Sequence, residues 1–288
     1  MIKKLPVVLL MAWPYFSQAQ GFKEAQISLS GSFAKPLEIE AINKGQEIDF
    51  FCVNKSFFPY QLEIIFSGVQ NLNGPRSQKS TVMPGRQRLL SLQIQDPNTP
   101  HTYEYSFGYA MGSPKANPDL SYPYLVPASQ GAEARINESY NNQLLLNPKD
   151  YIVAMRRGVV TSTPDVKGES DRLFNGAFEV LHEDGTVAVY KTVASNTTQL
   201  VKSGDKIYPG QPIGQSQGGG ILTYNVYILL GQGRAKSFDH NVVVSSDGLT
   251  RLAAFKGCKV EHPATVIEKE LSKKEIKKFR DGSLFKQN

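Results

Sequence analysis

The chain contains few residues that could bind a metal or act as a nucleophile. Its four histidines are His101, His182, His240 and His262, and no two of them stand at the spacing of a metal-binding motif. Cys258 is too isolated in the sequence to indicate a nucleophile. No serine stands in a nucleophile-elbow pattern. We therefore interpret the histidines as ordinary loop or strand residues.

The two cysteines, Cys52 and Cys258, allow at most one disulfide. The bond would have to join two predicted domains, and the sequence does not show whether the two residues approach each other. An oxidising compartment outside the cytoplasm would permit it. Two buried free thiols are the alternative.

The first 19 residues have the pattern of a cleavable signal peptide. Lys3 and Lys4 precede the apolar run Leu5–Phe16, and Ser17–Ala19 places small residues at the cleavage-determining positions. The run is too short to span a bilayer, and no later segment is apolar over about 18 residues. An N-terminal strand or helix is the alternative. The pattern predicts a periplasmic or secreted protein with no transmembrane segment after cleavage.

The charge of the chain is concentrated near its C-terminus. The formal charge is +6, and loss of Lys3 and Lys4 with the signal leaves +4. Lys259–Asn288 has eight Lys and Arg against five Asp and Glu, a net charge of +3. The rest is near neutral, which argues against a nucleic-acid partner. The basic tail could contact anionic cell-wall polymers or lipid; a solvated, partly helical tail is the other interpretation.

Short strands predict an all-β first domain over residues 20–111. Apolar side chains alternate in Leu62–Phe66, Leu90–Ile94 and Tyr103–Tyr109, with turn-rich breaks between them. A period of two over short runs is typical of a β-sandwich. No charged cluster stands out in these runs, so the pattern favours a recognition or spacer module.

A linker and a second β-rich domain follow. Residues 112–130 are rich in Pro, Ser, Asn and Tyr and have no period, which predicts a linker. The alternative is an ordered loop, containing Tyr122–Leu125, that packs across the second domain. In residues 131–257, Asp184–Gly185 between alternating apolar residues predicts a hairpin. In residues 258–288, the apolar spacing over Thr265–Phe279 predicts one amphipathic helix.

Three segments of the second domain carry a family resemblance. Val153–Val160 has the form of a strand that enters a Gly-Val-Val turn. Glu179–Thr186, followed by Tyr190, has the form of a hairpin. Val201–Gly214 contains two glycine turns. In this order the segments resemble those of the M23 (LytM-like) peptidoglycan endopeptidases.

The last segment has a clear physical basis. Gly204 and Gly210 suit two tight turns, and Ile207 and Ile213 are expected to point into a small barrel. The resemblance implies an all-β chain with an M23/LytM-like β-barrel of the lipoyl-like, duplicated-hybrid-motif type. An immunoglobulin-like β-sandwich is expected before it and a short C-terminal helix after it.

The resemblance also implies where zinc ligands would stand. The family binds Zn²⁺ through a His, an Asp and the second His of a His-x-His on a late strand, and another His assists catalysis. This chain has other residues there, none of them a normal zinc ligand. The positions are Asn137, Gln143, Thr192, Leu222 and Tyr224, with Asn225 included if the late strand is shifted by one residue.

We therefore expect a catalytically degenerate member of the family, a pseudoenzyme with no catalytic residues, no zinc and no other cofactor. Its expected role is that of a binding, scaffold or regulatory module in the cell envelope, with peptidoglycan or an envelope protein such as a wall hydrolase as partner. One alternative is a zinc metalloendopeptidase that acts on peptidoglycan with atypical ligands. Another is a structural subunit of an exported protein assembly.

Overall fold

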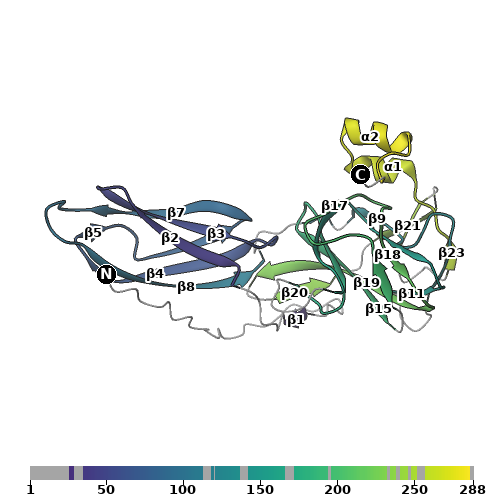
Figure 1. Ribbon diagram of the computed structural model, residues 1–288, viewed down its shortest axis with the longest axis horizontal. Coiled ribbons are helices and arrows are strands. Elements are labelled where there is room, and N and C mark those ends of the chain that lie inside the picture. Colours follow the sequence, from purple (N-terminus) through teal and green to yellow (C-terminus); the bar gives the residue numbers. More distant parts are fainter. Residues whose placement is uncertain are drawn as a thin grey trace. The chain divides into compact units, whose positions relative to one another are not determined.

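The computed structural model is mainly β, with several antiparallel sheets and a short helical segment near the C-terminus (Figure 1). The chain divides into a smaller unit, Met1–Lys115 with Leu229–Ala235, and a larger unit, Ala116–Ile228 with Lys236–Asn288. The structure describes residues 26–28, 35–112, 118–119, 121–136, 142–165, 172–193, 196–231, 234–237, 241–245, 248–251 and 257–285.

Two antiparallel sheets make up most of the smaller unit. One has the order β2-β3-β7-β5 and the other β6-β4-β8. Their strands are β2 (Leu37–Asn43), β3 (Glu47–Asn54), β4 (Tyr60–Gln70), β5 (Leu72–Asn73), β6 (Ser77–Val82), β7 (Gly85–Ile94) and β8 (Thr102–Met111).

Apolar side chains from both sheets form one core in the smaller unit. Phe50 of β3 and Phe66 of β4 meet edge to face, with ring centroids 4.8 Å apart. The alternation predicted for β4 is confirmed, because Leu62, Ile64 and Phe66 are buried and the residues between them are more exposed. The alternation of apolar residues along β4 therefore indicates a strand with one buried face.

Cys52 lies in β3 and is a buried free thiol. The disulfide that the sequence allowed is therefore not formed at Cys52, while the side chain of Cys258 is outside the described residues. Burial raises the pKa of the Cys52 thiol to about 11. Because the thiolate is the reactive form, this thiol is inert near neutral pH.

Three sheets contribute to one apolar cluster in the larger unit. The longest runs β17-β13-β14-β15-β19-β11-β10-β23, and the others are β12-β18-β16 and β22-β21-β9. Neighbours on these paths are antiparallel except β9 and β21, which are parallel. Two strands off these paths, β1 and β20, pair with each other; by the division given above, β1 and residues 234–235 of β20 belong to the smaller unit.

The bounds of these strands are β1 (Gln26–Ser28), β9 (Pro123–Leu125), β10 (Glu133–Ile136), β11 (Gln143–Leu146), β12 (Tyr151–Val153), β13 (Gly158–Ser162), β14 (Phe178–Leu181), β15 (Thr186–Val193), β16 (Thr197–Gln199), β17 (Lys206–Ile207), β18 (Pro212–Ser216), β19 (Gly220–Gly231), β20 (Arg234–Ser237), β21 (Asn241–Ser245), β22 (Gly248–Arg251) and β23 (Gly257–Lys259).

The predicted turns of the larger unit are confirmed. β14 and β15 form an antiparallel hairpin, and Gly185 in its turn has a φ of 82°. Gly204 and Gly210 have φ values of 92° and 79°, in the left-handed region that favours glycine. Ile207 and Ile213 are fully buried in the apolar cluster, as the turn pattern predicts.

Part of the predicted linker is packed into the larger unit. Tyr124, Leu125 and Val126 are fully buried, and β9 pairs with β21. The backbone N–H of Leu125 donates to the carbonyl oxygen of Met155 at 3.1 Å. Residues 121–128 thus have the structure that the ordered-loop interpretation of this segment predicts.

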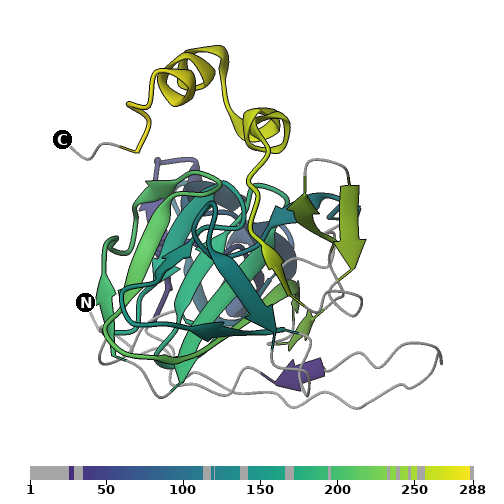
Figure 2. The same ribbon diagram turned by 90° about the vertical axis from the view of Figure 1, so that its right-hand side faces the viewer.

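The sequence predicts one helix over residues 265–279, whereas the structure has α1 (Ala264–Ile267), η2 (Glu268–Glu270) and α2 (Lys273–Arg280). We call Ala264–Arg280 the helical segment; it lies to one side of the strands of the larger unit (Figure 2). Ser272 and Glu275 form a capping box that starts α2. Because an N-cap residue has an extended backbone, Ser272 divides the predicted helix. Within the described ranges, no helix has the length and apolar character needed to cross a membrane.

Candidate functional site

Three neighbouring strands carry most of the positions at which the resemblance implies zinc ligands. β19 lies between β11 and β15. Leu222 of β19 is opposite Thr192 of β15, and the next residue of β19 is opposite Gln143 of β11. Strand pairing therefore brings these three residues to one part of the sheet. Asn137 lies outside the described residues.

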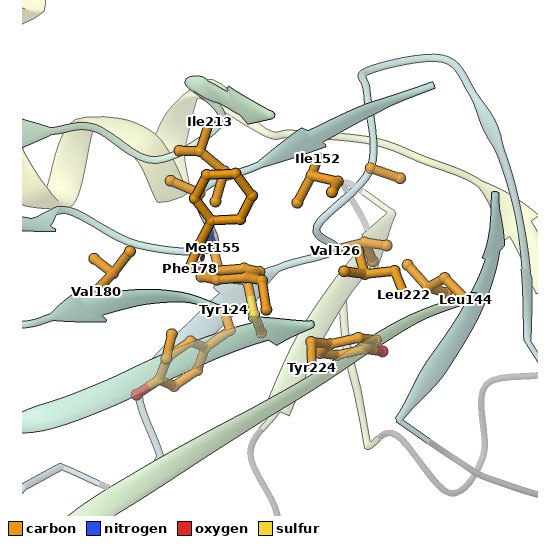
Figure 3. Close-up of a cluster of buried hydrophobic side chains, with 14 of the residues drawn as sticks. Tyr124, Val126, Leu144, Ile152, Met155, Phe178, Val180, Ile213, Leu222 and Tyr224 are labelled. Carbon is orange, nitrogen blue, oxygen red and sulfur yellow. Dashed lines mark hydrogen bonds between the residues drawn. The ribbon is translucent and has the colours of Figure 1, made fainter. Parts of the chain in front are cut away.

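Apolar side chains fill this part of the larger unit. Leu222 and Tyr224 are fully buried. They alternate along β19, so both point to the same face of the strand. Leu144 of β11 and Val126 of the segment after β9 lie close to Leu222 in the same cluster (Figure 3). In the described part of the chain, this position is therefore a packed core.

The polar candidate residues contact other polar side chains of the fold. Oγ1 of Thr192 lies 3.0 Å from Oγ1 of Thr197. Nδ2 of Asn142 donates to Oδ1 of Asn225 at 2.6 Å. Threonine hydroxyls and asparagine amides are not ordinary zinc ligands. These residues therefore cross-link neighbouring segments of the larger unit.

Two histidines of the larger unit contact backbone carbonyl groups. Nδ1 of His182 lies 2.7 Å from the carbonyl oxygen of Arg157. Nε2 of His262 lies 3.1 Å from the carbonyl oxygen of Val126, and burial lowers the pKa of His262. His101 belongs to the smaller unit, and the fourth histidine is outside the described residues. His182 and His262 therefore bind the backbone of the fold.

The residues do not fit the zinc ion that the resemblance implies. Zinc sites in proteins take three or four ligands from Cys, His, Asp and Glu. The described ranges contain no group of three or more such residues that could hold a metal. Leu222 and Tyr224, for which the resemblance implies a His-x-His pair, lie among hydrocarbon side chains. No catalytic step through zinc follows from this geometry.

A buried ion cluster lies near the other end of β15. Nη1 of Arg156 donates to Oδ2 of Asp184 at 2.7 Å, and Nε donates to Oε1 of Glu270 at 2.8 Å. The Arg156 side chain is 7% exposed, and its guanidinium lies 3.9 Å from the centroid of the Tyr122 ring. The two carboxylates offset the desolvation of this buried charge. This cluster was not predicted from the sequence. The signal that could have found it is the position of Arg156 and Arg157 directly after an apolar run, where a buried arginine needs acidic partners.

Arg157 also binds the helical segment through hydrogen bonds. Its backbone N–H donates to Oε2 of Glu270 at 2.6 Å, and Nη1 donates to Oε2 of Glu275 at 3.1 Å. The Tyr208 hydroxyl donates to Oε1 of Glu275 at 3.1 Å. An apolar cluster accompanies these contacts: Leu125, Ile267 and Leu271. The arrangement is a structural anchor, because its carboxylates already accept hydrogen bonds.

Glu179 of β14 is a second buried acid. Its Oε1 accepts hydrogen bonds from the backbone N–H groups of Leu173 at 2.7 Å and Phe174 at 2.6 Å. Its Oε2 has no hydrogen-bond partner among the residues that the structure describes. Burial raises the pKa of Glu179 to about 7, because desolvation outweighs the effect of the two N–H groups. The carboxyl group thus binds the loop before β14. In this loop, the ring centroid of Phe174 lies 5.0 Å from that of Tyr227.

Comparisons with known proteins show a distant structural likeness. No family model matches the chain, and no curated protein matches it. Two crystal structures of Helicobacter pylori Csd3, from an orthorhombic and a hexagonal crystal, are similar at a TM-score of 0.28 and 12% sequence identity. The likeness covers 70% of this chain and 72% or 70% of the Csd3 chain. At this identity and TM-score, Csd3 gives no information on the activity of this chain.

Proposed function

We propose that this chain is an exported, non-catalytic LytM-like protein that serves as a binding, scaffold or regulatory module in the cell envelope. The observation that carries the proposal is the full burial of Leu222 and Tyr224 where the resemblance implies a His-x-His pair. Placing an ion among hydrocarbon side chains without ligands is very costly. The proposed protein is thus a pseudoenzyme that keeps the scaffold and has lost hydrolysis.

The proposal assumes an immunoglobulin-like sandwich in the smaller unit and a LytM-type barrel in the larger unit. The sandwich is supported by the core that the two sheets share. The barrel is supported by the left-handed Gly204 and Gly210 and by the buried Ile207 and Ile213 in the segment that resembles the family. Export is supported by the positive start and short apolar run of residues 1–19.

The proposed partner is peptidoglycan or an envelope protein such as a wall hydrolase. The side chains of Val126, Leu144 and Leu222 occupy the position in which the family would place its metal and the scissile bond of its substrate. Binding is therefore expected on outer surfaces of the larger unit rather than among β11, β15 and β19.

Zinc content and peptidoglycan hydrolysis of the purified protein test the proposal together. We expect no bound zinc and no clearing in a peptidoglycan zymogram, while an active wall hydrolase in the same gel clears it. Sedimentation with purified sacculi then measures binding. One equivalent of tightly bound zinc together with clearing would refute the proposal and favour an endopeptidase with atypical ligands.

A variant with Leu222→His and Tyr224→His sharpens this test. If the position is a packed core, two buried imidazoles should destabilise the larger unit, and the variant should not gain zinc. Thermal unfolding with and without zinc reads out both effects. Stoichiometric zinc binding with no loss of stability would contradict the packing argument.

A structural subunit of an exported assembly is the second candidate function. The packed side chains of Leu222 and Tyr224 favour it as well, because two units that do not catalyse a reaction can both serve as interaction modules. Affinity purification from the cell envelope separates the two candidates. A stable stoichiometric protein partner without sacculus binding would favour the assembly subunit, and sacculus binding by the isolated protein would favour the first proposal.

A further inference from the structure

The acidic residues of the helical segment face inward or are paired. Glu270 and Glu275 accept hydrogen bonds from Arg156 and Arg157 of the larger unit's body. Glu268 forms a bidentate pair with Arg280, with both N···O distances at 2.8 Å. The negative charge of the segment is therefore neutralised within the fold.

The lysines of the helical segment remain exposed. None of them forms an ion pair with any residue in the described part of the chain. The exposed lysines are Lys269, Lys273, Lys274, Lys277 and Lys278. Folding thus pairs the carboxylates of the helical segment and leaves its five lysines exposed, with Asp281 just after α2 as the one exposed acid described beside them.

The orientation of α2 fixes this surface. Positions 273, 274, 277 and 278 fall on one side of a helix with 3.6 residues per turn. Glu275, Ile276 and Phe279 fall on the opposite side, and the latter two pack against the apolar cluster of Leu125, Ile267 and Leu271. The apolar side of α2 is therefore turned to the body of the larger unit. We call the side formed by the exposed lysines the lysine face.

We propose that the lysine face binds the surface of a membrane that contains anionic phospholipids. Lysine ammonium groups are compact point charges that attract anionic headgroups without fixed geometry. Directional recognition of a phosphate or carboxylate usually employs the arginine fork, and Arg280 is already occupied by Glu268. Because the apolar side of α2 is packed, the association is electrostatic and does not insert into the bilayer. This inference does not depend on a relation to LytM.

Vesicle sedimentation of the full chain tests the proposal. The wild-type protein should bind vesicles of phosphatidylglycerol and phosphatidylcholine at low salt, and not vesicles of phosphatidylcholine alone. Each lysine near an anionic surface should raise the partition coefficient about fivefold. The double variant Lys273→Gln/Lys277→Gln should therefore partition about 25-fold more weakly. High salt should abolish binding of the wild type.

A matched control removes the same charge elsewhere in the larger unit. Lys191→Gln/Lys202→Gln changes two other exposed lysines and should bind vesicles like the wild type. All four positions are exposed, so circular dichroism should show both variants folded. Equal losses in the two double variants, or no binding by the wild type, would overturn the proposal. So would lysine-dependent binding to sacculi without binding to anionic vesicles, because the partner would then be a polymer.

Discussion

Replacing Glu179 by glutamine should make the larger unit more stable, but only at higher pH. The pKa of this carboxyl group is raised from 4.5 to about 7 by burial. Between these two pH values, the unfolded chain has released the proton and the folded chain still holds it. Stability therefore falls as pH rises through this interval, because the folded state binds more protons than the unfolded state.

The magnitude follows from the two pKa values. A pKa difference of one corresponds to about 1.4 kcal/mol, so the rise from 4.5 to about 7 costs the wild type about 3 kcal/mol once the pH exceeds 7. Glutamine keeps the Oε1 acceptor for the N–H groups of Leu173 and Phe174 and cannot ionise. Glu179→Gln should therefore be near neutral below pH 4.5 and stabilising by about 3 kcal/mol above pH 7.

Urea denaturation of both proteins, followed by circular dichroism, measures this difference across the pH interval. Other groups titrate equally in the two proteins, so the difference in unfolding free energy isolates Glu179. Glu183→Gln is the control, because the Glu183 side chain is 86% exposed in the adjacent turn. It should show no comparable pH dependence. A stability difference between wild type and Glu179→Gln that does not change with pH would refute the reasoning.

Leu144→Ala should lower the unfolding free energy by about 2–5 kcal/mol, and Leu145→Ala on the exposed face of the same strand by under about 1 kcal/mol. Equal losses in urea denaturation would contradict the packing at the candidate site. Arg156→Met should cost about 3–5 kcal/mol, because Glu270 loses a buried partner; an unchanged thermal midpoint would count against this. In a variant that retains Cys52 alone, a thiol reagent should react slowly before unfolding and rapidly after it; fast reaction of the native protein would disprove burial.

The turns of the larger unit could be predicted because their cause is local. Gly185, Gly204 and Gly210 all have left-handed backbone conformations, which a side chain disfavours. The division of the helical segment could also have been predicted, since Ser272 followed by Glu275 has the spacing of a capping box. Such features depend on a few neighbouring residues.

The packing of the candidate site depends on residues far apart in the sequence. Val126 reaches the cluster because β9 pairs in parallel with β21, and no pattern within residues 112–130 indicates that pairing. The sequence also did not predict which face of β15 is buried. Val187 and Ala188 are both fully buried, so hydrophobic alternation does not distinguish the two sides of this strand. The resemblance implies where zinc ligands are absent, but only the fold shows which side chains surround those positions.

The pairing of β10 with β23 has a consequence for how the larger unit is made. Glu133 stands opposite Lys259, and Val260 just after β23 is fully buried. During synthesis, the edge of β10 therefore lacks this neighbour until residues 257–259 have emerged, and Arg156 lacks its partner until Glu270 has emerged. Contacts of such long sequence separation form late and slowly. The larger unit can therefore close only after residues 257–270 have been synthesised, and shorter nascent chains lack the strand that pairs with β10 on this side.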